Sequence, residues 1–223
     1  MALVDSNQDA AAQRLKMVNG QLRVCDVTDL DLLAAFLDAP RDAFVAADRA
    51  RFAYLDSDQP SLGSTARRLL APTTLARLIQ AASVKPGDRV LDVGGGAGYG
   101  AAVLARLGAR VTALESDAGA AAAARRLLAD RADVEVVEGD LAAGAKGRGP
   151  FDAIVVEGGF EVPPDGLLAE LAENGRLVGI DAGGAAPEAT LIERASNGFC
   201  RRALFEAQAA TLEAFRRPPG FLF

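Results

Sequence analysis

A glycine-rich turn carries the residues of this sequence that are best suited to bind a ligand. The segment LDVGGGAGYG places Asp92 in an apolar run and Gly94, Gly96 and Gly98 directly after it. Glycines let the backbone approach a ligand closely, and the helix expected after them presents free N–H groups. The carboxylate of Asp92 would repel a pyrophosphate and attract a cation. The turn therefore favours a ligand with a positively charged end, although Gly96-x-Gly98-x-x-Ala101 also fits the dinucleotide pattern.

Two further acids follow the next two apolar runs. Glu115 ends the run that begins at Arg110, and a carboxylate there can accept hydrogen bonds from both hydroxyls of a ribose. Asp140 closes the third run, a place where an acid can also cap a helix or turn. The ring of Tyr99, just after the glycines, could accept a cation or pack on the sheet.

Strand and helix patterns alternate from Arg89 onwards, which is typical of a parallel sheet with helices on both faces. Strands are expected at 89–94, 110–116, 133–140, 151–159 and 176–181, with two more at 189–196 and 199–207. Helices are expected at 9–23, 29–37, 72–82 and 167–175, the second of them capped by Thr28. The predicted fold class is α/β, with a doubly wound, mostly parallel seven-stranded sheet.

The chain is expected to form one compact unit. Its 223 residues suit a single α/β domain better than two small ones. Residues 1–83 are predicted to be an N-terminal helical extension, or lid, packed on a Rossmann-like core at 84–223.

Composition excludes several kinds of function. Histidine is missing, so serine–histidine and cysteine–histidine nucleophiles and His-ligated metal sites cannot be built, and no metal is expected. A net charge of −6 argues against a nucleic-acid partner. The sequence contains neither a secretory signal nor an apolar run long enough for a membrane span. We therefore expect a cytoplasmic protein with no membrane partner.

The glycine turn resembles the D/E-x-G-x-G-x-G motif of class I methyltransferases, whose acid lies near the cationic amino-acid end of S-adenosyl-L-methionine. The flanks are similar to the protein-L-isoaspartate O-methyltransferase family, which has a VPR-x-x-FV-like connector and a VLExGTGSGYQAAVLA segment. This chain has APRDAFV at 39–45 and VLDVGGGAGYGAAVLA at 90–105. It continues with GDL at 139–141, PFDAI at 150–154 and VPPDGLLAEL at 162–171, and the likeness spans 17–180. A divergent member of that family is the implied identity.

This resemblance implies a Rossmann-like class I methyltransferase fold and S-adenosyl-L-methionine as the cofactor. Asp140 is then similar to the acid that meets the adenine amino group. The residues implied to bind the cofactor are Asp92, Gly94, Gly96, Gly98, Tyr99, Glu115, Ser116, Asp140 and Leu141.

One departure concerns the methyl acceptor. Counting back from Pro72, the Thr-Ile-Ser of the family's GQTIS-QP segment falls on residues 68–70, so Leu70 stands where the family serine meets the substrate carboxylate. Isoaspartyl methylation is therefore in question. Ser64, Thr65, Arg68 and Leu70 are the residues expected at the acceptor region.

The chemistry expected is transfer of a methyl group to a carboxyl oxygen. A carboxylate is already deprotonated at neutral pH, so it can attack the sulfonium methyl without a general base, and no catalytic residue is assigned. The acceptor would be a protein, a peptide or a small carboxylate, and the enzyme a monomer or dimer. The alternatives are a non-catalytic S-adenosylmethionine-binding protein and a nucleotide-dependent oxidoreductase.

Overall fold

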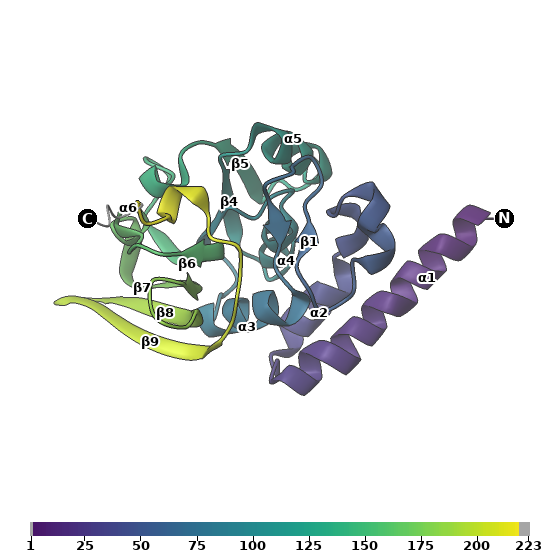
Figure 1. Ribbon diagram of the computed structural model, residues 1–223, viewed down its shortest axis with the longest axis horizontal. Coiled ribbons are helices and arrows are strands. Elements are labelled where there is room, and N and C mark those ends of the chain that lie inside the picture. Colours follow the sequence, from purple (N-terminus) through teal and green to yellow (C-terminus); the bar gives the residue numbers. More distant parts are fainter. Residues whose placement is uncertain (1, 219–223) are drawn as a thin grey trace, which may run out of the picture.

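The computed structural model describes residues 2–218, with side chains from residue 9. Its centre is a seven-stranded sheet with the order β5-β4-β3-β6-β7-β8-β9 (Figure 1). The first five strands in this order are parallel, and β8 and β9 are antiparallel to their neighbours. The sheet strands are β3 (Arg89–Val93), β4 (Arg110–Glu115), β5 (Val134–Glu138), β6 (Phe151–Phe160), β7 (Leu171–Asp181), β8 (Glu188–Ala195) and β9 (Gly198–Glu206). The predicted fold class, including the strand number, is confirmed.

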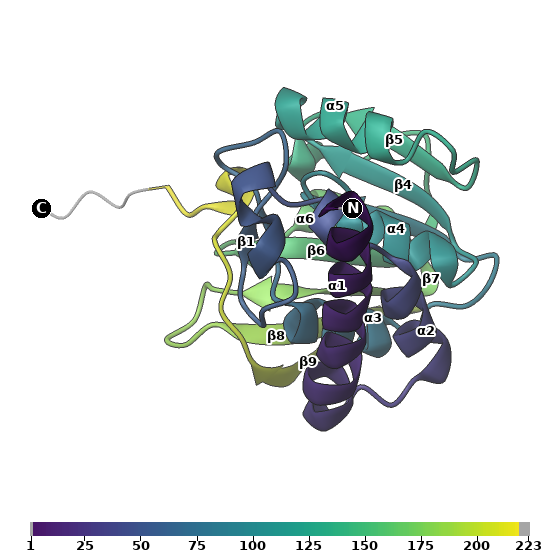
Figure 2. The same cartoon turned by 90° about the vertical axis from the view of Figure 1, so that its right-hand side faces the viewer.

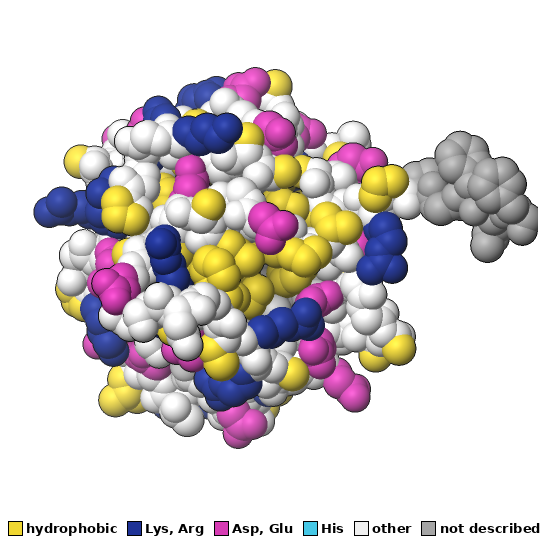
Figure 3. Space-filling model, turned by 90° about the vertical axis from the view of Figure 1, so that its left-hand side faces the viewer, with side chains coloured by type: hydrophobic (Ala, Val, Ile, Leu, Met, Phe, Trp, Pro, Cys, Tyr) yellow, Lys and Arg dark blue, Asp and Glu magenta, His cyan; other side chains and the backbone are white. Residues whose placement is uncertain are grey.

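Helices cover one face of the sheet more completely than the other. Figure 2 shows α1 to α4 in front of the strands. The helices are α1 (Ala2–Met17), α2 (Leu30–Asp38), α3 (Pro72–Ala82), α4 (Tyr99–Arg106), α5 (Ala118–Leu127) and α6 (Asp165–Leu168). Figure 3 shows the opposite face, where hydrophobic side chains gather in the middle of the view and charged side chains surround them.

A continuous hydrophobic core joins the N-terminal part of the chain to the sheet. It contains Met17 of α1, Phe36 of α2, Leu75 of α3 and Val155 of β6. A second cluster lies on the other face and includes Leu91 of β3. In the part of the chain that the structure describes, no helix has both the length and the apolar character that crossing a membrane requires.

Three local predictions were wrong. The helix expected at 167–175 stops at Leu168, and the strand β7 begins already at Leu171, which pairs with Phe151 of β6. Pairing with a central strand outweighs the helical pattern there. Asp29, not Thr28, is the N-cap of α2, because its carboxylate accepts hydrogen bonds from two amides of the first turn. The first helix begins earlier than expected and continues as a π-helical turn at Val18–Leu22.

Two segments run across the carboxyl edge of the sheet. The first, which we call the hairpin, consists of β1 (Gln59–Pro60), β2 (Arg68–Leu69) and the loop 61–67 between them. The second, the strap, is the segment 207–212 that follows β9, where Thr211 makes a parallel bridge to Gly159 of β6. Figure 1 shows the strap crossing in front of the strand ends. Both segments therefore lie over the edge at which ligands bind in open α/β folds.

Candidate cofactor site

The predicted glycine turn joins β3 to α4 at this edge. Gly94, Gly96 and Gly98 all have positive φ, with values of 72°, 63° and 89°. At Gly96 a side chain would also collide with the hydroxyl of Ser61 from the hairpin. That hydroxyl accepts a hydrogen bond of 2.9 Å from the backbone N–H of Ala97. Glycine is thus required both by backbone conformation and by the close approach of the hairpin.

Asp92 lies beneath this turn, beside an acid that the sequence analysis did not select. Glu157 comes from the adjacent strand β6, and Asp92 and Glu157 are 1% and 2% exposed. A Cβ placed on Gly95 would lie 2.7 Å from Oδ2 of Asp92 and 2.9 Å from Oε1 of Glu157, so both carboxyl groups face the same backbone. Apart from the two acids themselves, no described residue is a hydrogen-bond partner of their four oxygens. The turn therefore covers two carboxyl groups that depend on each other for a hydrogen bond.

These two groups share a proton. Burial raises the pKa of Asp92 well above its usual range, and the negative charge of Glu157 and a hydrogen bond to it raise this pKa further. Burial also raises the pKa of Glu157, to about 6, although the hydrogen bond from Asp92 and the charge of Arg41 oppose the rise. Asp92 is thus the protonated partner and donates to the carboxylate of Glu157.

Arg41 is a fully buried cation whose charge lowers the pKa of Glu157. Its Nε donates a hydrogen bond of 2.8 Å to the carbonyl of Ala53, and its Nη2 donates one of 2.7 Å to the carbonyl of Leu70. Its guanidinium also lies over the ring of Tyr99, 4.8 Å from the centroid. Arg41 therefore fixes the N-terminal connector against the segment that precedes α3.

Glu115 stands at the end of β4, where it was predicted. Its Oε2 accepts a hydrogen bond of 3.0 Å from the amide of Gly96. Its Oε1 accepts hydrogen bonds from Arg67 Nε at 2.8 Å and from the amides of Ser116 and Asp117. The Arg67–Glu115 ion pair is well buried, with side chains 11% and 3% exposed. A ribose at Glu115 would therefore have to share Oε2 or displace Arg67.

The predicted acceptor residues of the hairpin do not converge on one point. Ser64 donates a hydrogen bond of 2.7 Å to Asp117 and accepts from the amide of Arg67, so its hydroxyl holds the hairpin loop in place. Thr65 is exposed. Arg68 is exposed too, and its Nη2 makes a long contact of 3.4 Å to the carbonyl of Asp58.

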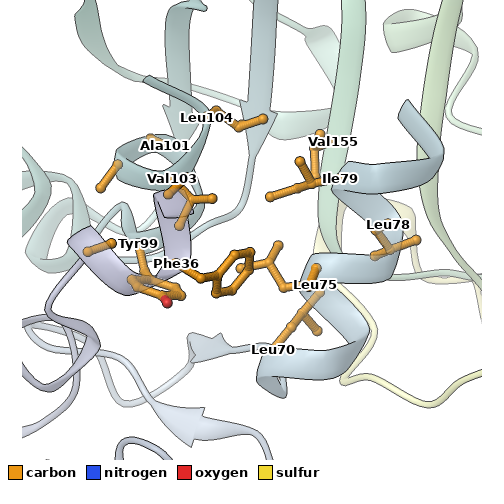
Figure 4. Packing of buried hydrophobic residues seen from close by; sticks show 14 of the residues in the cluster. Phe36, Leu70, Leu75, Leu78, Ile79, Tyr99, Ala101, Val103, Leu104 and Val155 are labelled. Atoms are coloured by element: carbon orange, nitrogen blue, oxygen red, sulfur yellow. The ribbon is translucent and has the colours of Figure 1, made fainter. Parts of the chain in front are cut away.

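Leu70 and Tyr99 both face the hydrophobic core. Figure 4 shows Leu70 beside Leu75, and Tyr99 beside Phe36. The centroids of the Tyr99 and Phe36 rings are 5.9 Å apart in an edge-to-face arrangement. The ring of Tyr99 thus packs in the core, and the cation over it is Arg41 of the chain itself, while its role in cofactor binding stays a prediction.

The remaining predicted residues follow the strands β4 and β5. Asp140 is exposed, and its Oδ1 accepts a hydrogen bond of 3.0 Å from the amide of Ala142, so it caps a short 3-10 turn. Ser116 is exposed, and its hydroxyl accepts a hydrogen bond of 2.7 Å from Nη2 of Arg67. Leu141 is buried, and its side chain lies 3.4 Å from a Cβ placed on Gly94.

A small cavity lies between the hairpin, the strap and β6. It measures about 20 Å³, room for about one water, and Leu70, Gly94 and Glu157 are among its lining residues. Leu212 of the strap approaches Gly94, with Cδ1 3.0 Å from a Cβ placed there. The contacts of Arg67 and Leu212 depend on how the hairpin and the strap dock, so no local sequence pattern indicates them. A larger ligand at Gly94 therefore requires the hairpin or the strap to move.

Two curated relatives of this chain carry the same name. The protein-L-isoaspartate O-methyltransferase of Methylorubrum populi is 43% identical over 169 residues, which cover 75% of this chain and 78% of the relative. The protein of that name from Koribacter versatilis is 36% identical over 195 residues and 86% of each chain.

Solved structures agree with these relatives. A protein-L-isoaspartate O-methyltransferase structure has a TM-score of 0.78 and 25% identity, and covers 89% of this chain and 65% of the solved one. A Plasmodium falciparum chain in complex with S-adenosyl-L-homocysteine has the same fold, with a TM-score of 0.76 at 22% identity, covering 89% of this chain and 97% of that one. The family model named Protein-L-isoaspartate(D-aspartate) O-methyltransferase (PCMT) matches residues 14–203. On the strength of that match and of the sequence identities, the chain belongs to the protein-L-isoaspartate(D-aspartate) O-methyltransferase family.

Proposed function

We propose that this protein binds S-adenosyl-L-methionine and transfers its methyl group to a carboxyl oxygen of a protein, a peptide or a small carboxylate. The observation that carries the proposal is the glycine turn of positive φ above the buried acid Asp92, with Glu115 at the end of the neighbouring strand. Family membership supports the same cofactor, because relatives carry the name of an O-methyltransferase.

The residues present fit this cofactor at both of its polar ends. The buried pair of Asp92 and Glu157 carries negative charge and has no hydrogen-bond partner among the other described residues, so a cationic amino-acid tail beside Asp92 would compensate it. Oε2 of Glu115 accepts only one hydrogen bond from the described part of the chain and can accept another from a ribose hydroxyl. When bound, the cofactor supplies an electrophilic methyl group on a positively charged sulfur.

The chain's own groups would orient the reactants rather than move a proton. A carboxylate acceptor attacks without a base, so alignment and exclusion of water are the main requirements. The hairpin and the strap already close the edge of the sheet above Gly94 and would exclude water from a bound ligand. Arg68, exposed beside the cavity, is suited to attract an anionic acceptor.

The test begins with calorimetric titration of S-adenosyl-L-methionine and S-adenosyl-L-homocysteine into the purified protein. We expect both to bind, and Glu115→Ala to lose about 1–3 kcal/mol of binding free energy because ribose hydroxyls would be left unpaired. Unchanged affinity in Glu115→Ala would remove Glu115 from the site. Binding of NADH without either sulfur compound would instead favour the oxidoreductase alternative.

Transfer itself needs a second measurement. Incubation with a methyl-labelled donor and an isoaspartyl peptide should leave base-labile label on the peptide. Donor binding without transfer to any carboxyl acceptor would favour a non-catalytic S-adenosylmethionine-binding protein. Two observations favour that second candidate: Leu70 faces the core where the family carries a serine, and the cavity beside it holds about one water.

A further inference from the structure

Glu157 is an acid that neither the family motif nor the proposed function assigns. It is 2% exposed, it lies among apolar residues of β6, and it lines the small cavity together with Gly94, Arg68 and Leu70. Apart from Asp92, no residue in the described part of the chain donates a hydrogen bond to its two carboxyl oxygens. A buried carboxylate with so few donors costs several kcal/mol, so a purely structural role would be better served by an apolar residue.

The charges around Glu157 leave it without a full counter-ion. Glu115 of β4 adds negative charge, and Asp58 of the segment before the hairpin is a further acid at the cavity. Arg41 opposes them; its Nε and Nη2 donate to the carbonyls of Ala53 and Leu70, and its Nη1 has no hydrogen-bond partner among the described residues. Arg67 at the cavity is paired with Glu115, and Tyr99 beside Arg41 is neutral at ordinary pH because burial raises its pKa. The site therefore gains most from an incoming cation.

The place of Glu157 suggests which cation this is. The carboxyl group of Glu157 lies next to that of Asp92, beside which the amino-acid tail of the cofactor is expected. Glu157 also lines the cavity together with Leu70 and Arg68, where the methyl acceptor is expected. It therefore adjoins both places. In methyl transfer the sulfur must lie between the amino-acid tail and the acceptor, because the methyl group points at the attacking oxygen.

We propose that Glu157 is a specificity-determining residue that, through its negative charge, selects the sulfonium of S-adenosyl-L-methionine over the uncharged sulfur of S-adenosyl-L-homocysteine. This inference rests on the proposed function and adds a residue to it. A cation bound at Glu157 also lowers the pKa of this acid, so donor binding releases protons near pH 6.

Calorimetric titration of both compounds into the full-length protein and Glu157→Gln tests the proposal. We expect Glu157→Gln to weaken S-adenosyl-L-methionine binding about tenfold and S-adenosyl-L-homocysteine binding less than about twofold. Titration at pH 6 in two buffers of different ionisation enthalpy should show fewer protons released by the variant. Glu138→Gln, an exposed acid of β5, is the matched control and should keep both affinities.

Other variants and outcomes separate the possible failures. Asp92→Asn should weaken the binding of both compounds alike, since both carry the amino-acid tail. Thermal unfolding establishes that each variant is folded. If Glu157→Gln lost affinity for both compounds equally, or for neither, selection by the charge on sulfur would be overturned. The proposed function would still stand. If the wild-type protein bound neither compound, the proposed function would fall and take this inference with it.

Discussion

At the scale of single residues, Glu157 can be buried only because position 100 of α4 is a glycine. A Cβ placed on Gly100 would overlap Oε1 of Glu157. Glycine in a helix interior costs roughly 1 kcal/mol relative to alanine, so the first turn of α4 gives up stability to make room for the carboxylate. The amino end of a helix favours a negative charge, which offsets part of the cost of burying Glu157 there.

Gly100→Ala should therefore depend on what stands at position 157. In the wild-type background we expect it to cost about 2 kcal/mol of unfolding free energy through overpacking. In a Glu157→Ala background the same change should cost nothing or stabilise by up to about 1 kcal/mol, because the added methyl group meets open space and alanine favours the helix. Denaturant unfolding of the four proteins in this double-mutant cycle measures the coupling.

The control for that cycle is Gly20→Ala in the π-helical turn, where an added Cβ has no atom within 4 Å among the described residues. It should be neutral or slightly stabilising in both backgrounds. A cost for Gly100→Ala that stays the same after removal of Glu157 would mean that the backbone of α4, and not the carboxylate, sets the requirement.

Asp92, the three glycines and Glu115 could be predicted because each stands at a strand end, and strand ends follow from local apolar runs. Glu157 stands in such a run too, in FDAIVVEGG, and an acid inside a buried strand was the signal that could have identified it. Residues that act through distant docking had no such signal. Arg41 and Arg67 lie outside the apolar runs of the sequence, and only the packed chain brings them to Leu70 and Glu115.

At the scale of elements, the hairpin is fastened to the carboxyl edge of the sheet by polar contacts. Ser61 accepts from the amide of Ala97, Ser64 donates to Asp117, and Arg67 pairs with Glu115. The contacts place a cation on the carboxylate that the ribose is expected to use. The hairpin is thus both a cover of the site and a competitor for one of its residues.

Arg67→Ala should separate these two roles. We expect a loss of about 1–3 kcal/mol of unfolding free energy, since a buried charge-assisted hydrogen bond is removed. Affinity for S-adenosyl-L-homocysteine should rise at least about threefold because Glu115 is freed for the ribose. Chemical unfolding and calorimetric titration measure the two effects on the same samples.

An exposed ion pair gives the matched control. Arg125 and Glu138 are 46% and 44% exposed at a distance of 3.3 Å, so Arg125→Ala should change stability by less than about 1 kcal/mol and leave the affinity unchanged. Should Arg67→Ala lower the affinity as Glu115→Ala is expected to do, Arg67 would be a ligand-binding residue and not a competitor.

Elements were predictable where local pattern and tertiary pairing agree. The five strands that begin at Arg89, Arg110, Val134, Phe151 and Leu171 all contain the expected apolar runs. The segment that begins at Leu171 has helical spacing as well, and its pairing with Phe151 decided the outcome. The hairpin and the strap carry no period of their own, so their positions over the turn follow only from the assembled sheet.

At the scale of the whole molecule, the buried acid pair should make stability depend on pH in an unusual direction. The pKa of Glu157 rises from 4.5 to about 6 on folding, and that of Asp92 rises as well. The folded protein then binds more protons than the unfolded chain between these values, so stability falls as pH increases through the window. An acid held by a cation behaves oppositely: Arg148 lowers the pKa of Glu135, which contributes stability that is lost as pH falls.

The unfolding free energy of wild-type protein minus that of Glu157→Gln should therefore decrease by roughly 2 kcal/mol between pH 4.5 and 7, since one pKa unit corresponds to about 1.4 kcal/mol. Urea unfolding across this range measures the difference, and comparison with the variant removes the contributions of all groups except Asp92, whose pKa Glu157 also raises. The same difference for Glu135→Gln should increase with pH, which gives an internal check of sign. If the difference in unfolding free energy between wild type and Glu157→Gln stayed constant or rose with pH, both acids would be ionised in the folded protein. Arg41 or water would then compensate their charge fully. The proton release expected on binding a cation would then have no source.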